Sequence, residues 1–142
     1  MNAKYFLDTN IFIYALEGEP LAKAAVAQEL IARAIAEGSG VISYQVVQEC
    51  LNAVTGKARF ALTPDELQSL LNNTLMPLCR VFPNAQGFYA SGLDIRARYK
   101  FHFYDALIVA AALEAGCERL YTEDLQHGQT IGALLIENPF AA

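Results

Sequence analysis

The sequence is poor in cysteine, in long apolar runs and in positive charge. Its three cysteines, Cys50, Cys79 and Cys117, are far apart and odd in number, a pattern that fits neither a disulfide framework nor a zinc site. We therefore expect them to be reduced, buried side chains of a cytoplasmic protein. No apolar run approaches the ~20 residues that span a bilayer. The segment from Met1 to Leu7 lacks the basic and long apolar regions of a signal peptide.

Positive charge is outweighed by negative charge along the chain. Ten Lys and Arg residues stand against fifteen Asp and Glu residues, which gives a net charge of −5 and a pI of about 4.9. Broad, non-specific binding to nucleic acid relies on positive charge, so this balance argues against it. A local basic strip beside an acidic site remains compatible with the composition.

The alternation of short β-like runs with longer helical runs predicts an α/β fold in one domain over residues 1–142. Hydrophobic residues make up 54% of the chain, which is enough for a sizeable core. Alternating strands and helices are typical of a parallel sheet with helices on both faces. Five strands are expected: Tyr5 to Leu7, Gly40 to Ser43, Leu78 to Phe82, Arg119 to Thr122 and Ala133 to Glu137.

The expected helices have recognisable ends. They cover residues 9–18, the stretch from 21 to the turn at Gly38, residues 44–56, a segment beginning at Thr63, residues 84–99 and the stretch after Asp105. Thr63 can cap its helix, Pro64 suits the first turn, and Glu66 completes a capping box.

Asp105 stands immediately before the most apolar helical stretch. Of the nine residues from Ala106 to Glu114, only the last is polar, and a helix that is apolar on nearly every side lies inside a protein. A carboxylate held against such a helix is unfavourable unless something compensates its charge. The ordinary alternative is that Asp105 only caps the helix.

Three further carboxylates are expected at the same edge of the sheet. Asp8 follows the first strand and Asp124 follows the fourth, and the carboxyl ends of parallel strands share one edge. Glu49 lies in the helix after the second strand, at the margin of its apolar stripe. Taken singly, Asp8 can be read as a helix cap, Glu49 as a solvated helix residue, and Glu123 and Asp124 as turn residues.

Carboxylates that face one another repel unless a cation lies between them or some take up protons. The group contains no His or Cys, so an all-oxygen ligand set favours Mg²⁺, with Mn²⁺ as an alternative, over Zn²⁺. Mg²⁺ keeps several waters and readily takes phosphate oxygens. Such a site can activate water, hold a phosphodiester and neutralise the charge that develops.

Four stretches make the chain resemble the PIN-domain ribonucleases, particularly the VapC-type toxins of toxin–antitoxin pairs. They are FLDTNIFIYAL at 6–16, VVQEC at 46–50, FYDALIVAAA at 103–112 and LYTEDLQHG at 120–128, in the order of the family. The resemblance covers essentially the whole chain, and the first and third stretches are its specific motifs.

The resemblance implies a three-layer α/β/α sandwich with a five-stranded parallel sheet. The implied reaction is Mg²⁺-dependent endonucleolytic cleavage of RNA by metal-activated water. The implied partners are a cognate antitoxin, which inserts residues into the acidic cleft, and a second copy of the chain in a homodimer.

The resemblance also assigns roles to individual residues. The acids that it places at the metal and in catalysis are Asp8, Glu49, Asp105 and Asp124. Glu123 is the alternative to Asp124, although Asp124 matches the family spacing better. Residues that it places in support, through hydrogen bonds, are Thr9, Asn10 and Thr122.

Basic residues flank two of the acids and are candidates for holding RNA phosphates. Those that lead toward the apolar helix are Arg96, Arg98, Lys100 and His102, and those that follow the Glu49 helix are Lys57 and Arg59. The alternative is a solvated basic surface. Five aromatic residues are expected to be core or dimer contacts rather than base-stacking platforms: Phe12, Tyr14, Phe101, Phe103 and Tyr104.

Three other functions compete with nuclease activity. A phosphoacceptor receiver domain also gathers acids at strand ends, but it needs a lysine near the last strand, and the final lysine here is Lys100. A phosphate-transfer hydrolase with Asp8 as nucleophile favours a second aspartate two residues on, where this chain has Asn10. A catalytically silent α/β binding module is the third, and an RNA cleavage assay with Mg²⁺ against EDTA distinguishes it.

Overall fold

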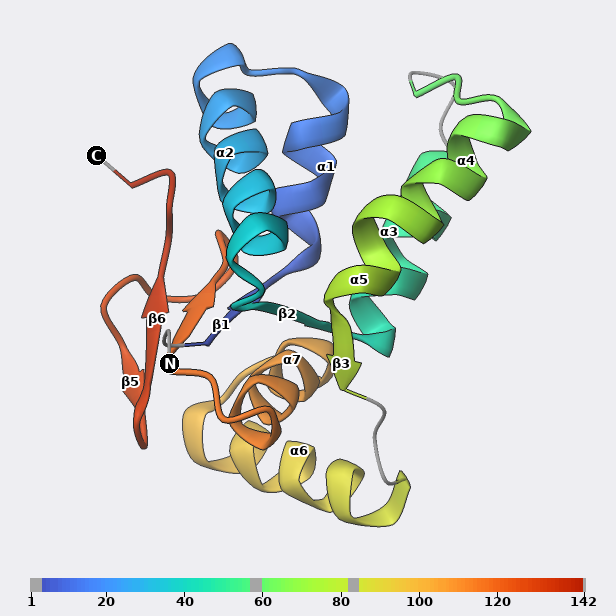
Figure 1. Cartoon of the computed structure of the whole chain (residues 1–142). Coiled ribbons are helices and arrows are strands. Elements are labelled where there is room, and N and C mark those ends of the chain that lie inside the picture. The colour runs from blue at the N-terminus through green and yellow to red at the C-terminus, as the bar shows by residue number, and fades with distance from the viewer. Residues whose placement is uncertain (1–3, 57–59, 82–84, 142) are drawn as a thin grey trace.

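The computed structural model describes residues 4–56, 60–81 and 85–141 (Figure 1). Its strands are β1 (Tyr5–Leu7), β2 (Gly40–Ser43), β3 (Cys79–Val81), β4 (Arg119–Tyr121), β5 (Thr130–Ile131) and β6 (Leu134–Glu137). Its helices are α1 (Thr9–Glu17), α2 (Leu21–Glu37), α3 (Tyr44–Gly56), α4 (Pro64–Leu70), the π-helical stretch η1 (Leu71–Leu75), α5 (Met76–Leu78), α6 (Ala85–Tyr99) and α7 (Phe103–Glu114). No helix in these ranges is long and apolar enough to cross a membrane.

The central sheet confirms the predicted α/β class and adds one strand to it. The strand order is β3-β2-β1-β4-β6-β5, and every neighbouring pair is parallel except β5 with β6. The extra strand β5 has only two residues and turns back through Gly132, whose φ of 58° lies in the left-handed region that suits glycine. The expectation of five strands missed this short hairpin because two residues carry no alternating pattern.

The order of the strands reverses between β1 and β4. The chain runs from β1 to β2 and β3 on one side and then returns past β1 to β4 and β6 on the other. Open α/β sheets bind ligands at the carboxyl ends of the strands beside such a reversal. Pairing of Phe6 with Leu120 brings the ends of β1 and β4 to the same level. The backbone N–H of Asp8 then donates to the carbonyl of Tyr121 at 3.0 Å.

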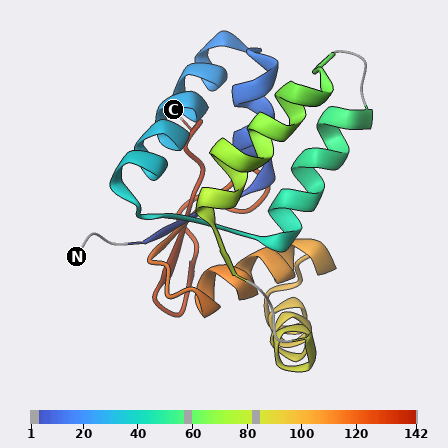
Figure 2. The same cartoon turned by 45° about the vertical axis from the view of Figure 1, so that its right-hand side comes forward.

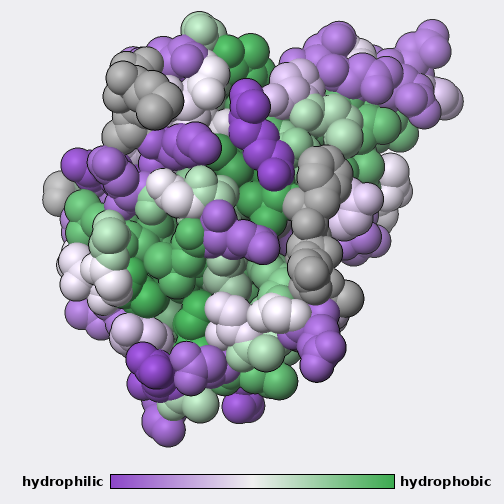
Figure 3. Space-filling model, turned by 60° about the horizontal axis from the view of Figure 1, so that its bottom comes forward, coloured by the Kyte–Doolittle hydropathy of each residue, from purple (hydrophilic) through white to green (hydrophobic). Residues whose placement is uncertain are grey.

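The helices cover both sides of the sheet. Figure 1 shows α6 and α7 below the sheet and the helices from α1 to α5 above it, and the turned view in Figure 2 agrees. Figure 3 looks toward the lower side, where hydrophobic side chains gather in an area bordered by hydrophilic ones. The apolar segment of α7 from Ala106 to Ala112 is buried, as its composition predicted.

Helix ends follow the sequence signals closely. Thr63 and Glu66 form the expected capping box: the Glu66 N–H donates to Thr63 Oγ1 at 3.1 Å, and the Thr63 N–H donates to Glu66 Oε1 at 3.0 Å. Gly18 and Gly38 end α1 and α2 with φ values of 74° and 70°. Lys100 follows α6 with φ 63°, a conformation that is uncommon for a non-glycine residue.

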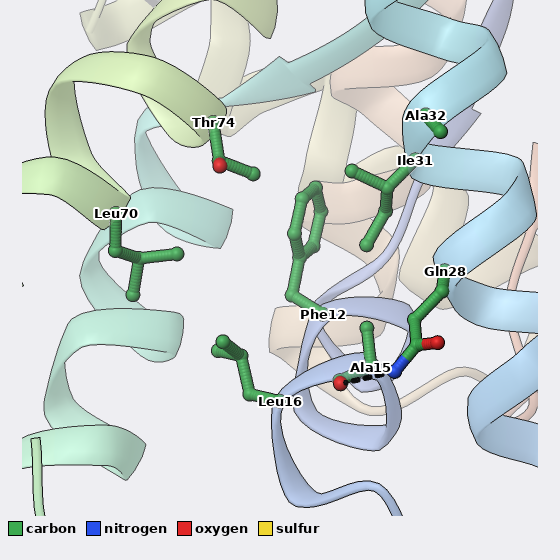
Figure 4. A pocket seen from close by; sticks show the side chains of 8 residues that line it. All are labelled: Phe12, Ala15, Leu16, Gln28, Ile31, Ala32, Leu70 and Thr74. Atoms are coloured by element: carbon green, nitrogen blue, oxygen red, sulfur yellow. Dashed lines mark hydrogen bonds between the residues drawn. The ribbon is translucent and has the colours of Figure 1, made fainter. Parts of the chain in front are cut away.

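The helical layer above the sheet contains an apolar pocket of about 240 Å³ between α1, α2 and the α4–η1 segment (Figure 4). Its lining residues are Phe12, Ala15, Leu16, Gln28, Ile31, Ala32, Leu70 and Thr74. The Gln28 side chain donates to the carbonyl of Ala15 at 3.1 Å and so ties α2 to α1 at the edge of the pocket.

The three cysteines behave as predicted. Cys50, Cys79 and Cys117 are free and buried, with at most 8% of each exposed. Burial raises the pKa of the Cys50 thiol to about 12 and that of Cys117 to about 11, so both are held as neutral thiols.

Candidate active site at the carboxyl ends of β1 and β4

Asp8 is the most buried acid of the site, with only 6% of its surface exposed. It is the N-cap of α1, because its Oδ1 accepts the Thr9 N–H at 2.7 Å. Its Oδ2 accepts from Thr122 Oγ1, also at 2.7 Å. The ordinary reading of Asp8 as a cap is therefore correct, but the cap lies inside the protein and faces β4.

The pKa of Asp8 is raised to about 7. Burial is the main cause, and the hydrogen bonds from Thr122 and Thr9 oppose it without cancelling it. The negative charges of Asp124 and Glu49 raise it further. Because a carboxylate responds to charges near it, this shift places Asp8 in the electrostatic field of two of the other predicted acids.

Thr122 links the ends of β1 and β4. Its side chain is fully buried. Its hydroxyl donates to Asp8 and accepts the N–H of Asp124 at 3.1 Å. Asn10 adds a second link, since its Nδ2 donates to Asp124 Oδ2 at 3.1 Å and lies 3.5 Å from Thr122 Oγ1. The other amide atom, Asn10 Oδ1, is buried without a hydrogen-bond partner among the described residues.

Glu49 reaches the site from α3. Its Oε1 accepts from Thr9 Oγ1 at 3.1 Å and from Gln45 Nε2 at 3.3 Å. Gln45 also donates to the carbonyl of Tyr104 at 3.1 Å, so it ties α3 to the first turn of α7. Sequence reasoning missed Gln45. Its position four residues before Glu49 on one helix face was the available signal.

Asp105 is half-buried in the first turn of α7. The N-cap of this helix is His102, and within the described chain no hydrogen bond reaches the Asp105 carboxylate, so Asp105 is not a cap. Burial raises its pKa, the charge of Asp124 adds to the rise, and His102 opposes it. Among the described residues, the charge of His102 offsets that of Asp105 without cancelling the rise, and Asp105 responds to the same Asp124 as Asp8.

The adjacent acids Glu123 and Asp124 have different surroundings. Glu123 forms an ion pair with Lys23 and accepts a hydrogen bond from the Tyr14 hydroxyl. Burial raises the pKa of Glu123, but the hydrogen bonds from Lys23 and Tyr14 outweigh it, so the net pKa is lowered. Asp124 instead accepts a hydrogen bond from Asn10, and its charge raises the pKa values of Asp8 and Asp105. Glu123 is thereby held away from the group that contains Asp8.

The donor atoms of the site suit a hard cation. The side chains present carboxylate, amide and hydroxyl oxygens, and Asn10 Oδ1 is a buried acceptor without a donor. Within residues 4–56, 60–81 and 85–141, however, no three His, Cys, Asp or Glu side chains converge closely enough to hold a metal ion as they stand. The chemistry of the residues therefore fits Mg²⁺, while the acids are more widely spaced than a closed metal site.

Three of the predicted basic residues lie outside this network, whereas the charge of a fourth, His102, acts on Asp105. Arg98 is exposed and pairs with Asp94 at 3.2 Å, one turn earlier on α6. Arg96 and Lys100 are also exposed, and no described contact joins any of the three to the acids. Two further basic residues that the sequence suggested, Lys57 and Arg59, lie outside the described residues.

The five aromatic residues expected in the core or in a dimer contact divide in two. Phe12 is buried, with 1% exposed, and three others pack partly buried against the core: Tyr14, Phe101 and Phe103. Tyr104 is 65% exposed, so it is not a core residue, and a dimer contact, the other expectation for it, stays a prediction. It precedes Asp105 in the first turn of α7 and faces outward because the opposite side of that helix fills the core.

Comparison with known proteins matches the chain to a family model. The family model described as PIN domain matches residues 5–130. Among curated proteins no sequence matches the chain.

Solved structures resemble the fold over most of their length. A toxin–antitoxin complex from Klebsiella pneumoniae is 19% identical, with a TM-score of 0.65 and coverage of 98% of this chain and 100% of that one. VapBC2 from Rickettsia felis, bound to a promoter DNA fragment, is 21% identical, with a TM-score of 0.61 and coverage of 94% and 97%. Mycobacterium tuberculosis VapC20, a sarcin–ricin loop cleaving toxin, is 17% identical, with a TM-score of 0.59 and coverage of 85% and 90%. At these identities the likeness concerns the fold.

Proposed function

The chain belongs to the PIN domain family, and on this premise we propose that it is a Mg²⁺-dependent endoribonuclease, the toxin of a toxin–antitoxin pair. The observation that carries the proposal is the position of Asp8 and Asp105. Asp8 lies at the carboxyl end of β1, beside the reversal of the sheet, and Asp105 lies in the first turn of α7. The pKa values of both are raised, and the charge of Asp124 contributes to each rise. Carboxyl groups with raised pKa values, gathered in one place, are typical of functional sites.

In this proposal four acids hold the metal: Asp8, Glu49, Asp105 and Asp124. A bound Mg²⁺ supplies a Lewis acid that lowers the pKa of water and neutralises charge on the phosphodiester. The burial of Asp8 strengthens electrostatic interactions at its own carboxylate.

The supporting residues have distinct proposed tasks. Thr122 fixes the Asp8 carboxylate and the backbone of Asp124 with a single hydroxyl. Asn10 orients the Asp124 side chain, and Thr9 orients Glu49. Together these bonds set the directions of three acids before any ligand is present, which reduces the reorganisation that catalysis requires.

The test is cleavage of total RNA by the purified chain with Mg²⁺, with Mn²⁺ and with EDTA. We expect cleavage with either metal and none in EDTA. The matched control is Asp65→Asn, which alters an exposed carboxylate in the first turn of α4 and should cut RNA at the parental rate. Full activity in EDTA refutes the metal mechanism, and inactivity on all RNA under every condition favours a silent binding module.

We propose that Arg96, Arg98 and Lys100 bind RNA phosphates outside the acidic group. Support comes from their exposure at and just after the carboxyl end of α6, a few residues before α7, whose first turn contains Asp105. Neutralising all three with glutamine should weaken RNA binding and flatten its dependence on salt, since fewer counterions are released. An unchanged salt slope in a filter-binding titration identifies them as surface charges only.

The proposed protein partners are an antitoxin and a second copy of the chain, and the proposed location is the cytoplasm. The toxin–antitoxin names of similarly folded structures support the antitoxin, and the three free cysteines support a reducing compartment. Sedimentation velocity tests the homodimer directly. An antitoxin that occupies the acidic cleft should stop RNA cleavage at one copy per toxin chain.

A further inference from the structure

A second pocket, separate from the acids, opens where α3, α6 and α7 meet at the carboxyl end of β2. It has a volume of about 170 Å³. The residues on which the argument depends are Ser43, Tyr44, Gln45, Gln48, Tyr89 and Tyr104. Its place at a strand end is where open α/β folds bind ligands.

Ser43, the last residue of β2, carries an unused hydrogen-bonding group. Only 3% of the residue is exposed, and its Oγ has no partner within the described part of the chain. A buried hydroxyl without a partner is unfavourable, so such a group in a native structure calls for an explanation. A ligand atom that enters the pocket would supply the missing hydrogen bond.

The walls of the pocket are aromatic and exposed. Tyr44, Tyr89 and Tyr104 have 50%, 47% and 65% of their surfaces exposed. Two of these rings are held by neighbouring aromatic rings: Tyr104 lies 5.4 Å from Phe103 and Tyr89 lies 5.7 Å from Phe88, centroid to centroid. Exposed rings that are held in this way offer flat surfaces to a planar ligand at little cost in side-chain entropy.

The polar groups of the pocket are neutral. Gln48 contributes an amide that can both donate and accept. Gln45 donates its two amide hydrogens to Glu49 and Tyr104 and so offers its carbonyl oxygen as an acceptor. None of the described lining residues is charged. A phosphate would need positive charge here, whereas the edge of a nucleobase presents donors and acceptors of the neutral kind. The volume is below the ~300 Å³ of pockets for drug-sized ligands, which suits a single planar ring system.

Hydrogen bonds of Gln45 connect the pocket to the acidic site. Gln45 lines the pocket and donates both to Glu49 and to the carbonyl of Tyr104. Tyr104 in turn precedes Asp105 in the chain. A group bound in the pocket therefore lies near Glu49 and Asp105, two of the acids proposed to hold the metal.

We propose that this pocket binds one unstacked base of the RNA strand and so contributes to the choice of cleavage site. The inference rests on the proposed nuclease function, since it names a part of the substrate. Tyr104 and its neighbours stack on the base, and the Ser43 hydroxyl with the glutamine amides reads its edge.

The first experiment measures binding without catalysis. The chain in EDTA is titrated with AMP, GMP, CMP and UMP and followed by ¹H–¹⁵N NMR, with ribose 5-phosphate as the ligand that lacks a base. We expect shifts at the amides of Ser43, Tyr44 and Tyr104 with at least one nucleotide and none there with ribose 5-phosphate. Equal shifts with the sugar phosphate, or no shifts with any nucleotide, overturn the proposal.

Variants then assign the binding to this pocket. Tyr104→Leu should weaken binding of the preferred nucleotide by roughly 5- to 150-fold, the range expected for loss of one stacked ring. Ser43→Ala should reduce the preference among the four bases. The matched control is Leu93→Ala on α6, one turn after Tyr89, which removes an exposed apolar side chain that does not line the pocket. Equal weakening by all three variants overturns the proposal.

RNA cleavage by the same variants tests the base pocket separately from the proposed nuclease activity. Cleavage at altered sites by Tyr104→Leu supports both. Normal cleavage, at parental sites, by Tyr104→Leu and Ser43→Ala rejects the base pocket and leaves the nuclease intact. Nucleotide binding by a chain that never cuts RNA rejects the nuclease instead. If sedimentation shows a dimer that Tyr104→Leu dissociates and nucleotides do not bind, a second copy fills the pocket and the proposal is wrong.

Discussion

At the scale of single residues, the site depends on hydroxyl and amide groups that hold the acids in place. Thr122 is the central one, because one buried oxygen both donates to Asp8 and accepts from the backbone of Asp124. A hydroxyl can serve both strands in this way only where two strand ends lie at the same level, as β1 and β4 do.

Thr122→Val tests this role, since valine keeps the shape and removes the hydroxyl. It leaves an Asp8 oxygen and the Asp124 N–H without a partner, which should cost about 1–3 kcal/mol of the free energy of unfolding. Urea unfolding measures the loss, and Thr122→Ser should recover most of it because the hydroxyl returns. Equal losses for valine and serine would mean that packing of the methyl group is what matters.

Asp105→Asn separates function from folding. The substitution keeps the size of the side chain and removes one negative charge from the field shared with Asp124. Without metal the variant should be as stable as the parent or more stable by about 1 kcal/mol. It should gain less stability from Mg²⁺ because ligand stabilisation follows affinity for the folded state, and RNA cleavage should fall steeply.

Paired thermal melts in EDTA and in Mg²⁺, with a cleavage assay on the same samples, test whether Asp105 serves metal binding or folding. A variant that is clearly less stable in EDTA and still active assigns Asp105 a structural role. The same result would remove the main support for a cation at this position.

At the scale of elements, the position of α2 over β2 is set by one glycine. A Cβ on Gly40 would lie 2.3 Å from the Cβ of Ala34 and 3.2 Å from its Cα. Both atoms belong to Ala34, a buried residue of α2, so they cannot move away without a shift of the whole helix. The close approach of this helix and strand therefore requires a residue without a side chain.

Gly40→Ala should lower the free energy of unfolding by about 1–3 kcal/mol, the usual cost of overpacking a core. The control is Gly87→Ala in α6, where an added Cβ meets nothing within 4 Å. Because alanine has a higher helix propensity than glycine, Gly87→Ala should leave the free energy of unfolding unchanged or raise it by up to about 1 kcal/mol. Urea unfolding of the three proteins compares them, and equal stabilities would contradict the close packing of α2 on β2.

At the scale of the whole molecule, the buried Asp8 links stability to pH. Its pKa is about 7 in the folded protein against an ordinary value of 3.8. Between these pH values the folded chain keeps the proton that the unfolded chain has lost. The folded state then binds more protons, so in the absence of metal stability falls as pH rises from about 4 to 7.

Urea unfolding in EDTA between pH 4 and pH 8 measures this linkage. The parent should lose stability on the order of 4 kcal/mol across the window, since each pKa unit corresponds to about 1.4 kcal/mol. The stability of Asp8→Asn should depend much less on pH, because the asparagine has no proton to release in this range. The exposed Asp65→Asn control should keep the parental slope, and a parent that gains stability toward pH 7 would contradict the burial of Asp8.

Local signals in the sequence determined the elements and the approximate place of the site. Glycines end α1 and α2, a capping box begins α4, and apolar composition buries α7, because each of these depends on residues within a few positions of one another. Asp8, Asp105 and Asp124 were expected at one edge because the handedness of parallel crossovers fixes where strands end. The family model that matches residues 5–130 agrees with the motifs that suggested the family.

Contacts between distant segments were decided by the tertiary structure alone. Lys23 of α2 holds Glu123 and leaves Asp124 to Asn10, Gln45 joins α3 to α7, and Tyr104 turns outward beside Ser43. The periodicity of the chain says which face of a helix is buried, but it does not say which polar side chain across the sheet lies within hydrogen-bonding distance. That choice depends on register, on helix position and on the burial of each partner, which are properties of the packed molecule.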